Sequence, residues 1–300
     1  MRLAITGATG FVGGHLLDAA AAAGQAVAAL TRRPQPPRDG VDWIAGSLDD
    51  RDALDRLVAG ADAVIHVAGV VNAPHAAGFE AGNVLGTGTV LAAAEAAGVA
   101  RFVHVSSLAA REPRLSHYGA SKARSEALVA AAPLATVIVR PPAIYGPGDR
   151  ELLEMFRMAS RGFVALPPPG RLSLLHAADL ARLLIALADT TAPGGIIEPD
   201  DGHQRGYSHV EFGQALGQAV GRPVRTLSVP AALLAIAARA DRLVRGDKAK
   251  LTPDRAAYFA HPDWVADPAR APDPALWSAC ISATQGLADT AAWYRANGLL

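Results

Sequence analysis

The sequence predicts an α/β fold in which helices cover both faces of a doubly wound parallel sheet. A glycine-rich turn follows the first apolar run, and strand-like runs then alternate with helical stretches through the first half. This alternation is the sequence sign of a parallel sheet. After Pro141 the rhythm becomes irregular and proline-rich. We therefore expect the second half to form a small, mostly helical C-terminal cap and no second complete sheet.

The first expected elements are a strand at residues 2–6 and a helix at 15–23, joined by a turn with three glycines. Gly7 permits a tight turn, Gly10 lets the backbone approach a pyrophosphate, and Gly13 allows the helix to pack on the sheet. The helix N-terminus would face the phosphates. The spacing departs from Gly-x-Gly-x-x-Gly, so the interpretation depends on its context.

The other elements are assigned from the pattern of apolar residues. Further strands are expected at 26–31, 41–45, 63–68, 101–106 and 136–140, and helices at 50–58, 83–97 and 118–131. Later helices are expected at 151–160, 177–189, 210–220, 231–244 and 284–297. This pattern predicts a nucleotide-binding domain at residues 1–165, to which residues 172–200 return, and a substrate-binding cap at 201–300.

Composition excludes several classes of protein. The 28 basic and 28 acidic residues give no net charge, and there is no basic stripe that would suit nucleic acid. The single cysteine, Cys280, excludes an internal disulfide, and no Cys/His cluster has metal-ligand spacing. His66 and His104, inside apolar strands, are expected to be structural. No apolar run suits a signal peptide or a membrane span, so we expect a cytoplasmic protein.

The second strand ends in Thr31-Arg32-Arg33, about twenty residues beyond the glycine turn. An acidic residue here would accept hydrogen bonds from an adenosine ribose, whereas arginine suits the 2′-phosphate of NADP. NADP(H) is therefore the preferred cofactor, with NAD(H) as the alternative. Two solvated arginines at a strand end would be the plainer interpretation.

Tyr118 and Lys122 stand four residues apart in a helical stretch, which puts them on one helix face. A nearby ammonium favours the phenolate, so we expect the pKa of Tyr118 to fall below its usual value of about 10. Such a pair is common on solvated faces. Ser107, however, follows the strand 101–106 where ligands bind in such sheets, and its hydroxyl can bond a substrate oxygen.

A series of short motifs runs along nearly the whole chain, and their order is more specific than any one of them. They are Thr6-Gly-Ala-Thr-Gly-Phe-Val-Gly13, His66-Val-Ala-Gly69, Asn83-Val-Leu-Gly-Thr87, Val105-Ser-Ser107, Tyr118-x-x-x-Lys122, Arg140-Pro-Pro-Ala-Ile-Tyr-Gly-Pro147, His176-Ala-Ala-Asp-Leu180, and Gly286-Leu-x-x-Thr290 with Trp293-Tyr294-Arg295. This series resembles the extended short-chain dehydrogenase/reductases, and within them the NAD(P)-dependent epimerase/dehydratase group.

The resemblance implies a Rossmann-type domain with a catalytic Ser107, Tyr118 and Lys122. In this family the tyrosine exchanges a proton with the substrate oxygen while hydride moves to or from a nicotinamide, and the lysine also holds the nicotinamide ribose. Asn83 matches a helix asparagine near the site. The residues expected to bind the cofactor are Gly7, Thr9, Gly10, Phe11, Val12, Gly13, Arg32, Arg33, Ser47, Leu48, Ala68, Gly69, Ser106, Tyr118, Lys122, Pro141, Ala143 and Ile144.

Departures from the group's pattern bear on the adenine contact and on the substrate. Ser47 stands where members often carry aspartate near the adenine. Leu108 and Ala109 replace the acidic pair of nucleotide-sugar dehydratases, which argues against elimination of water, and Ala143 replaces the asparagine of nucleotide-sugar epimerases. The segment from Arg140 to Asp149 is more similar to the 3β-hydroxysteroid dehydrogenase side of the group, which implies an apolar alcohol or ketone.

We therefore expect an NADP(H)-preferring oxidoreductase that interconverts a secondary alcohol and a carbonyl on a small, fairly apolar substrate, with Tyr118 as acid/base. The alternatives are an NAD-dependent nucleotide-sugar epimerase and a non-catalytic, nucleotide-bound subunit of an assembly. The intact Ser107, Tyr118 and Lys122 argue against the latter. The resemblance suggests a homodimer through helices 83–97 and 118–131, although nothing in the residues demands one. Substrate identity and reaction direction are not specified by the sequence.

The most apolar part of the cap is residues 230–244, which also carry Arg239 and Arg242, followed by Arg245. This segment could line a hydrophobic pocket or touch a membrane surface. A core helix with solvated arginines is the interpretation that the sequence favours.

Overall fold

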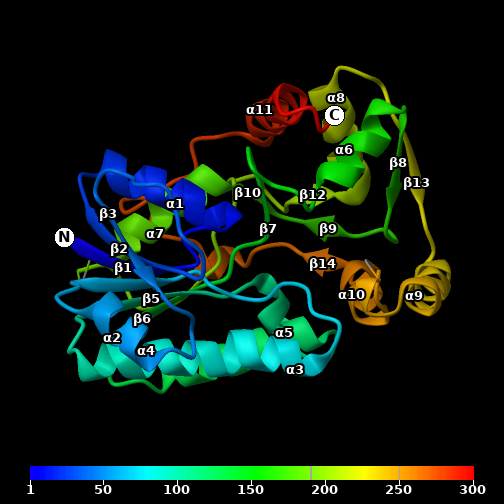
Figure 1. Cartoon of the computed structure of the whole chain (residues 1–300). Helices are drawn as coiled ribbons and strands as arrows, with labels where there is room; N and C mark the ends of the chain where they lie inside the picture. The colour runs from blue at the N-terminus through cyan, green and yellow to red at the C-terminus, as the bar shows by residue number, and fades with distance from the viewer. Residues whose placement is uncertain (190, 250) are drawn as a thin grey trace. The chain divides into compact units, whose positions relative to one another are not determined.

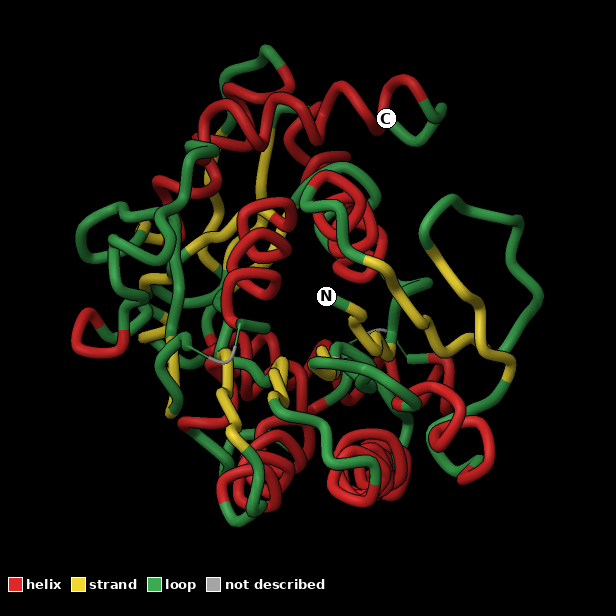
Figure 2. Tube along the Cα trace, turned by 90° about the vertical axis from the view of Figure 1, so that its left-hand side faces the viewer, coloured by secondary structure: helices red, strands yellow, loops and turns green. Residues whose placement is uncertain are grey.

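The chain divides into two compact units in the computed structural model, which describes residues 1–189, 191–249 and 251–300. The first unit comprises residues 1–141, 180–198 and 272–277, and the second comprises 142–179, 199–271 and 278–300. Figure 1 labels their elements where there is room, and helices and short strands alternate with loops along the chain (Figure 2). The assignment of residues 1–165 to the cofactor and 201–300 to the substrate stays a prediction.

A seven-stranded parallel sheet forms the centre of the first unit, in the order β11-β6-β5-β4-β1-β2-β3. The strands are β1 (Arg2–Thr6), β2 (Ala26–Thr31), β3 (Val41–Ala45), β4 (Ala63–His66), β5 (Arg101–Val105), β6 (Ala135–Val139) and β11 (Gly195–Ile197). Strand order runs outward in both directions from the β1–β4 pair, which is the topological switch point where ligands bind in such sheets. The predicted Rossmann-type, doubly wound fold is confirmed.

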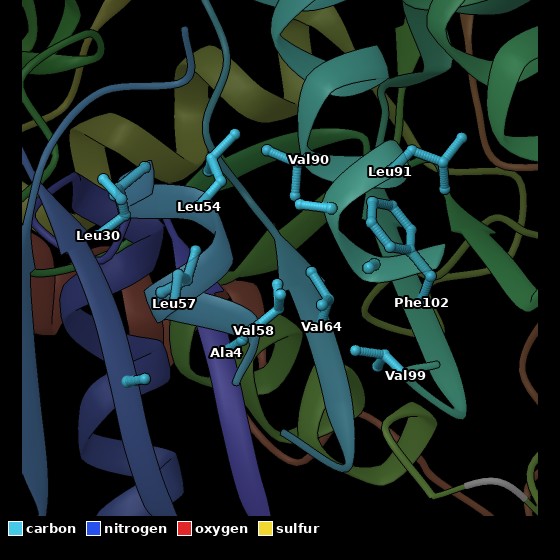
Figure 3. Packing of buried hydrophobic residues seen from close by; sticks show 14 of the residues in the cluster. Ala4, Leu30, Leu54, Leu57, Val58, Val64, Val90, Leu91, Val99 and Phe102 are labelled. Atoms are coloured by element: carbon cyan, nitrogen blue, oxygen red, sulfur yellow. The ribbon is translucent and has the colours of Figure 1, made fainter. Parts of the chain in front are cut away.

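Helices lie on both faces of this sheet: α2, α4 and α5 cover one face and α1 lies on the other (Figure 1). The helical segments are α1 (Phe11–Ala22), α2 (Arg51–Val58), α3 (Ala76–Phe79), the π-helix η1 (Glu80–Leu85), α4 (Gly86–Ala96), the 3-10 turn η2 (Leu108–Arg111), α5 (His117–Ala130) and α7 (Ala177–Leu187), which enters this unit at Leu180. Leu54 and Val90 of the helices pack with Phe102 of the sheet in one apolar core (Figure 3).

Two helices of the first unit begin earlier than the sequence predicts. α1 starts at Phe11, directly after the glycine turn, because Gly13 and Gly14 are helical residues and not part of the turn. The helix predicted from residue 83 begins at Ala76, because α3, the π-helix η1 and α4 follow one another without a break. The early start of α1 brings its N-terminus to the turn that carries Gly7 and Gly10.

The second unit is mostly helical, with three small sheets of short strands. Its helices are α6 (Leu153–Ser160), α8 (His209–Val220), α9 (Ala231–Arg245), α10 (Pro253–Ala260) and α11 (Ala283–Ala296), with 3-10 turns η3 (Gly246–Lys248) and η4 (Pro268–Arg270). The sheets are β7 (Ala143–Tyr145) with β10 (Leu174–His176), β8 (Phe163–Leu166) with β13 (Arg225–Ser228), and β9 (Arg171–Leu172) between β12 (Tyr207–Ser208) and β14 (Asp263–Trp264). The short strands were not predicted, because two to four residues are too few to show a period of two. The eight-residue helix α10 was not predicted either.

The favoured interpretation of residues 230–244 as a core helix is wrong. These residues do form a helix, α9, but Ala238 is its one buried residue. An apolar run shows that a segment would gain from burial, and it does not show that a partner is there to bury it. The core of the second unit is made instead by α6, α8 and α11 together with β7, β8 and β10.

The C-terminal motif is explained by the packing of α11 in the second unit. A Cβ on Gly286 would lie 2.8 Å from both the ring and the hydroxyl oxygen of Tyr145, so only glycine fits there. Thr290 donates its hydroxyl to the Gly286 carbonyl at 2.7 Å. Tyr294 is fully buried and makes an edge contact with Phe156, with ring centroids 5.1 Å apart. The glycine therefore sets how closely this helix approaches β7.

The close approach of α1 to the turn can be tested with two neighbouring glycines. A Cβ at residue 13 would lie 2.1 Å from the Gly7 carbonyl oxygen, whereas one at residue 14 meets nothing within 4 Å. We expect Gly13→Ala to lower the free energy of unfolding by about 1–3 kcal/mol through overpacking. Gly14→Ala should raise it by about 0.5–1 kcal/mol, because alanine is the better helix former. Urea denaturation measures both, and equal stabilities would contradict the packing argument.

Candidate active site

The glycine turn lies against the end of β4 and opens into α1. Gly7 has a φ of +76°, and a Cβ there would be 2.6 Å from the Ala68 amide nitrogen. The Gly10 amide donates to the Gly7 carbonyl at 3.0 Å, and Gly10 then serves as N-cap of α1 without a side-chain cap. The first N–H groups of α1 are thus left for a ligand, and Phe11, Val12 and Gly13 supply them. Thr9, also predicted to bind the cofactor, is exposed beside the turn.

A pocket of about 630 Å³ opens at the carboxyl ends of β2 and β3. Both Arg32 and Arg33 are exposed there, and Ser47 joins them. The Thr31 hydroxyl donates to the Arg33 carbonyl at 2.6 Å, which holds the loop after β2. Leu48 packs against the apolar core and is not among the residues that line the pocket.

The predicted catalytic residues at the end of β5 and the start of α5 come together. The Tyr118 hydroxyl is hydrogen-bonded to Ser107. Ser107 caps η2, since its Oγ accepts from the Ala109 amide at 3.2 Å. The Lys122 ammonium is buried one turn further along α5 and donates to the Val105 carbonyl at 2.9 Å. The capping of α5 by Ser116, which accepts from the Gly119 amide at 2.9 Å, fixes where this helix begins.

Asn83 is buried in the π-helix η1, an irregularity frequent at functional sites. Its Oδ1 accepts from the Val70 amide at 2.6 Å, and its Nδ2 donates to the Val70 carbonyl and to Ser121 Oγ, both at 2.9 Å. A Cβ on Gly69 would lie 3.2 Å from both Asn83 Oδ1 and Lys122 Nζ. The segment after β4 therefore passes directly over these two side chains, and Ala68 is held there by its amide, which donates to Thr6 Oγ1 at 3.3 Å.

The electrostatics of the pair on α5 differ from the prediction. Burial raises the pKa of Tyr118, and the hydrogen bond from Ser107 opposes that rise. Burial lowers the pKa of Lys122 to about 8, with Glu126 acting in the opposite direction. The expected lowering of the tyrosine pKa by lysine is wrong: desolvation is the larger effect, and the ammonium is bonded to the Val105 carbonyl. Tyr118 therefore keeps its proton at neutral pH.

Behind Lys122 lies a buried ionic network that the sequence analysis missed. Glu126 accepts two hydrogen bonds from Arg140, at 2.8 Å from Nε and 2.6 Å from Nη2. Arg140 Nη1 also contacts Glu198 at 3.2 Å. The Ser106 hydroxyl donates to Glu126 at 2.5 Å, so the side chain of this predicted cofactor residue is engaged by the network. Glu126 follows Lys122 by four residues, which places both on one helix face. This spacing was the one feature of the sequence that could have indicated the network.

The residues predicted to flank the nicotinamide are divided between the two units. Pro141 ends the first segment of the first unit, and its carbonyl accepts from the Leu108 amide, next to Ser107, at 3.2 Å. Ala143 and Ile144 lie on β7 in the second unit, where they pair with β10. Their role toward a cofactor stays a prediction.

The order of these motifs on this fold is matched by a family of enzymes. Residues 3–198 match the NAD dependent epimerase/dehydratase family. The chain belongs to this family. It is thus an extended short-chain dehydrogenase/reductase and an NAD(P)-dependent oxidoreductase or epimerase, as the motifs predicted.

Similar proteins include enzymes named for apolar substrates. A ceramide reductase of Caulobacter vibrioides is 39% identical over 99% of this chain and 96% of its own length. A 3 beta-hydroxysteroid dehydrogenase/Delta 5-->4-isomerase of Mycobacterium tuberculosis is 28% identical over 77% of this chain and 73% of its own length. Among solved structures, MoeE5 in complex with UDP-glucose and NAD superposes with a TM-score of 0.76 at 22% identity, covering 99% of both chains, and so has the same fold.

Neither a membrane span nor a metal site is found in the part of the chain that the structure describes. No helix within residues 1–189, 191–249 and 251–300 is long and apolar enough to cross a bilayer. Over the same residues, no group of three or more His, Cys, Asp and Glu side chains could hold a metal ion.

The two histidines on the central strands are fully buried and stacked, with ring centroids 5.5 Å apart. His66 contacts Thr6 Oγ1 at 2.7 Å and Thr87 Oγ1 at 2.9 Å, and His104 contacts Ser125 Oγ at 3.0 Å. Burial lowers the pKa of His66 from 6.5 to about 3 and that of His104 well below its ordinary value. These contacts support a structural role for both residues.

We expect this pair to make the fold sensitive to acid. The unfolded chain takes up a proton on each histidine near pH 6.5, but the folded protein resists it, so this stability is present above pH 6.5 and is lost as the pH falls toward 3. For His66 alone the loss between pH 8 and pH 5 is about 2 kcal/mol. In His104→Gln, urea unfolding should show a smaller loss over this range than in the parent protein. The exposed His75→Gln is the control, and the same loss in both variants would contradict the argument.

Proposed function

We propose that this protein is an NADP(H)-preferring reductase that converts a ketone on an apolar, lipid-like molecule to the secondary alcohol, and the reverse. The observation that carries the proposal is the buried Tyr118 hydroxyl, which is hydrogen-bonded to Ser107; burial raises its pKa further above the ordinary 10, so it holds its proton at neutral pH. A protonated phenol beside a serine hydroxyl is suited to donate to a carbonyl oxygen that becomes an alkoxide.

Each catalytic side chain has a distinct task in this proposal. The Ser107 hydroxyl would position the carbonyl oxygen, and Tyr118 would transfer its proton to that oxygen. Lys122 carries a positive charge below its pKa of about 8, which favours the phenolate left on Tyr118 after the transfer. Asn83 would fix the backbone of Val70 beside the site. A nicotinamide cofactor, when bound, supplies the hydride.

The first unit fits such a cofactor at two places. The turn at Gly7 and Gly10 leaves the N-terminus of α1 without a side-chain cap, which suits a pyrophosphate. The pocket beyond β2 has Arg32 and Arg33 in its lining, and none of its lining residues is acidic. A cationic pocket without a carboxylate suits a 2′-phosphate better than a ribose 2′-hydroxyl. This supports NADP(H) over NAD(H).

An apolar substrate is supported by the residues after Ser107 and by the relatives. Leu108 and Ala109 are buried and apolar where a dehydratase would carry two acids. The relatives are named for ceramide and for 3β-hydroxysteroids, both of them lipids with a secondary alcohol. We therefore place the substrate among long-chain or polycyclic lipids, with a ceramide-like molecule as the first choice.

Replacement of the tyrosine tests the reaction. We expect Tyr118→Phe to reduce turnover by about 10²–10⁴-fold, because the proton donor is removed. Affinity for NADPH should change by less than about twofold, measured as cofactor fluorescence. The assay follows NADPH consumption with a ceramide whose secondary alcohol has been oxidised to the ketone. Undiminished turnover in Tyr118→Phe would contradict the proposed role of Tyr118 as proton donor. Interconversion of UDP-glucose and UDP-galactose without net NADPH consumption would favour the epimerase alternative instead.

Replacement of an arginine in the pocket tests the cofactor preference. Fluorescence titration of the nucleotide-stripped protein should show at least about tenfold tighter binding of NADPH than of NADH, or about 1.4 kcal/mol. Arg32→Asp should weaken NADPH far more than NADH, since the added carboxylate repels the 2′-phosphate. Arg38→Asp, the same change in charge at a residue paired with Asp18 outside the pocket lining, is the control. Equal loss of both nucleotides in Arg32→Asp would refute the preference.

A further inference from the structure

α9 carries a row of large apolar side chains that face solvent. Leu233, Ile236, Leu243 and Val244 are 54%, 59%, 87% and 84% exposed. Ile236, Leu243 and Val244 follow Leu233 by three, ten and eleven residues. In an α-helix these separations place all four side chains on one face. Exposed single apolar residues are ordinary, but four large ones on one face within twelve residues form a patch that marks an interaction surface.

The other face of the same helix is the one that holds it in the second unit. Ala238 is buried and Leu234 is half-buried, and α9 packs beside α10. On this side the Asp241 carboxylate accepts from the Leu251 amide at 2.9 Å. The exposed face is therefore not needed to anchor α9 in the fold.

Positive charge accompanies this apolar face. Arg239, Arg242 and Arg245 are all exposed, and Asp241 is the one acidic residue of the helix. Helical geometry places Arg239 immediately beside Leu243, on the border of the apolar row. Arg242 and Arg245 lie further round the helix, and Arg245 pairs with Asp241 at 3.3 Å. A helix with an apolar face, an arginine on its border and further exposed arginines is the pattern of segments that lie in the interface of an anionic bilayer.

We propose that α9 docks this protein on the surface of a membrane that contains anionic phospholipid. Leu233, Ile236, Leu243 and Val244 enter the boundary between headgroups and acyl chains, and Arg239, on the border of the row, contacts the lipid phosphates. A second copy of this chain fits the face less well, because pairing α9 with itself would bring arginines of two protomers together. The proposal depends on α9 alone and stands apart from the proposed reaction, although docking would bring the enzyme to a lipid substrate.

The test is co-sedimentation of the full chain with vesicles of phosphatidylcholine alone and of phosphatidylcholine with phosphatidylglycerol at three to one. The protein should bind the anionic vesicles and lose that binding at high salt. Leu243→Ser should weaken binding about tenfold, and Arg239→Gln about fivefold. Val210→Ser, at an exposed apolar residue of α8, is the matched control and should bind as the parent protein does.

Failure of the parent protein to bind anionic vesicles would overturn the proposal, as would equal binding by Leu243→Ser. A dimer in size-exclusion chromatography that Leu243→Ser dissociates would also overturn it, because the face would then join two copies. Because Leu243 is 87% exposed, its replacement leaves the fold intact, which a thermal melt confirms. Reduction of a detergent-solubilised ketone should be unchanged in Leu243→Ser, so membrane docking and the reaction are judged separately.

Discussion

The first unit depends on the distance between the start of α1 and the turn that precedes it. With only hydrogen at Gly13, the helix backbone approaches the Gly7 carbonyl more closely than any side chain would allow. This contact fixes α1 over the sheet and brings the uncapped helix N-terminus to the carboxyl edge of β1. Gly7 allows the same turn to lie against the segment after β4. A phosphate site made of backbone N–H groups follows from these two contacts, with no cationic side chain required at the turn itself.

The chemistry of the candidate site depends on how burial acts on two neighbouring groups. A buried hydroxyl holds its proton more tightly, and a buried ammonium releases it more readily. Burial thus keeps Tyr118 protonated and brings the pKa of Lys122 down to about 8, so that Lys122 is the group of the two that titrates near neutral pH. Glu126 limits the fall of the lysine pKa, and its own negative charge is compensated by the two-pronged contact with Arg140. An uncompensated carboxylate in that position would be costly.

The sequence predicted the parts of this structure that leave a local signature. The bounds of β1, β2 and β3 agree with the prediction, because their apolar runs are short and end at polar or turn residues. Ser107 was singled out by its place after the strand 101–106, and its grouping with Tyr118 was implied by the family resemblance. The π-helix around Asn83 leaves no pattern in the sequence, since its residues are ordinary for an α-helix. The contact of Glu126 with Arg140 joins α5 to the residue that follows β6, and the separation of the two residues in the sequence does not indicate it.

The sequence also does not indicate which contacts a buried side chain makes, and for this reason the direction of the pKa shift of Tyr118 was predicted wrongly. Spacing shows that an ammonium is near a phenol, but the pKa depends on where the ammonium points and how much water reaches both groups. The Lys122 ammonium donates its hydrogen bond to the Val105 carbonyl, and the surrounding helices exclude water from both groups. For α9, the sequence does not show whether another part of the chain covers its apolar residues. Its apolar residues predicted burial, yet burial needs a second surface, and the described part of the chain supplies one for only one side of the helix. A row of exposed leucine, isoleucine and valine costs solvation energy in water. That cost is removed when the face meets an apolar phase, and Arg239 on the border of the row favours a phase that also carries phosphate.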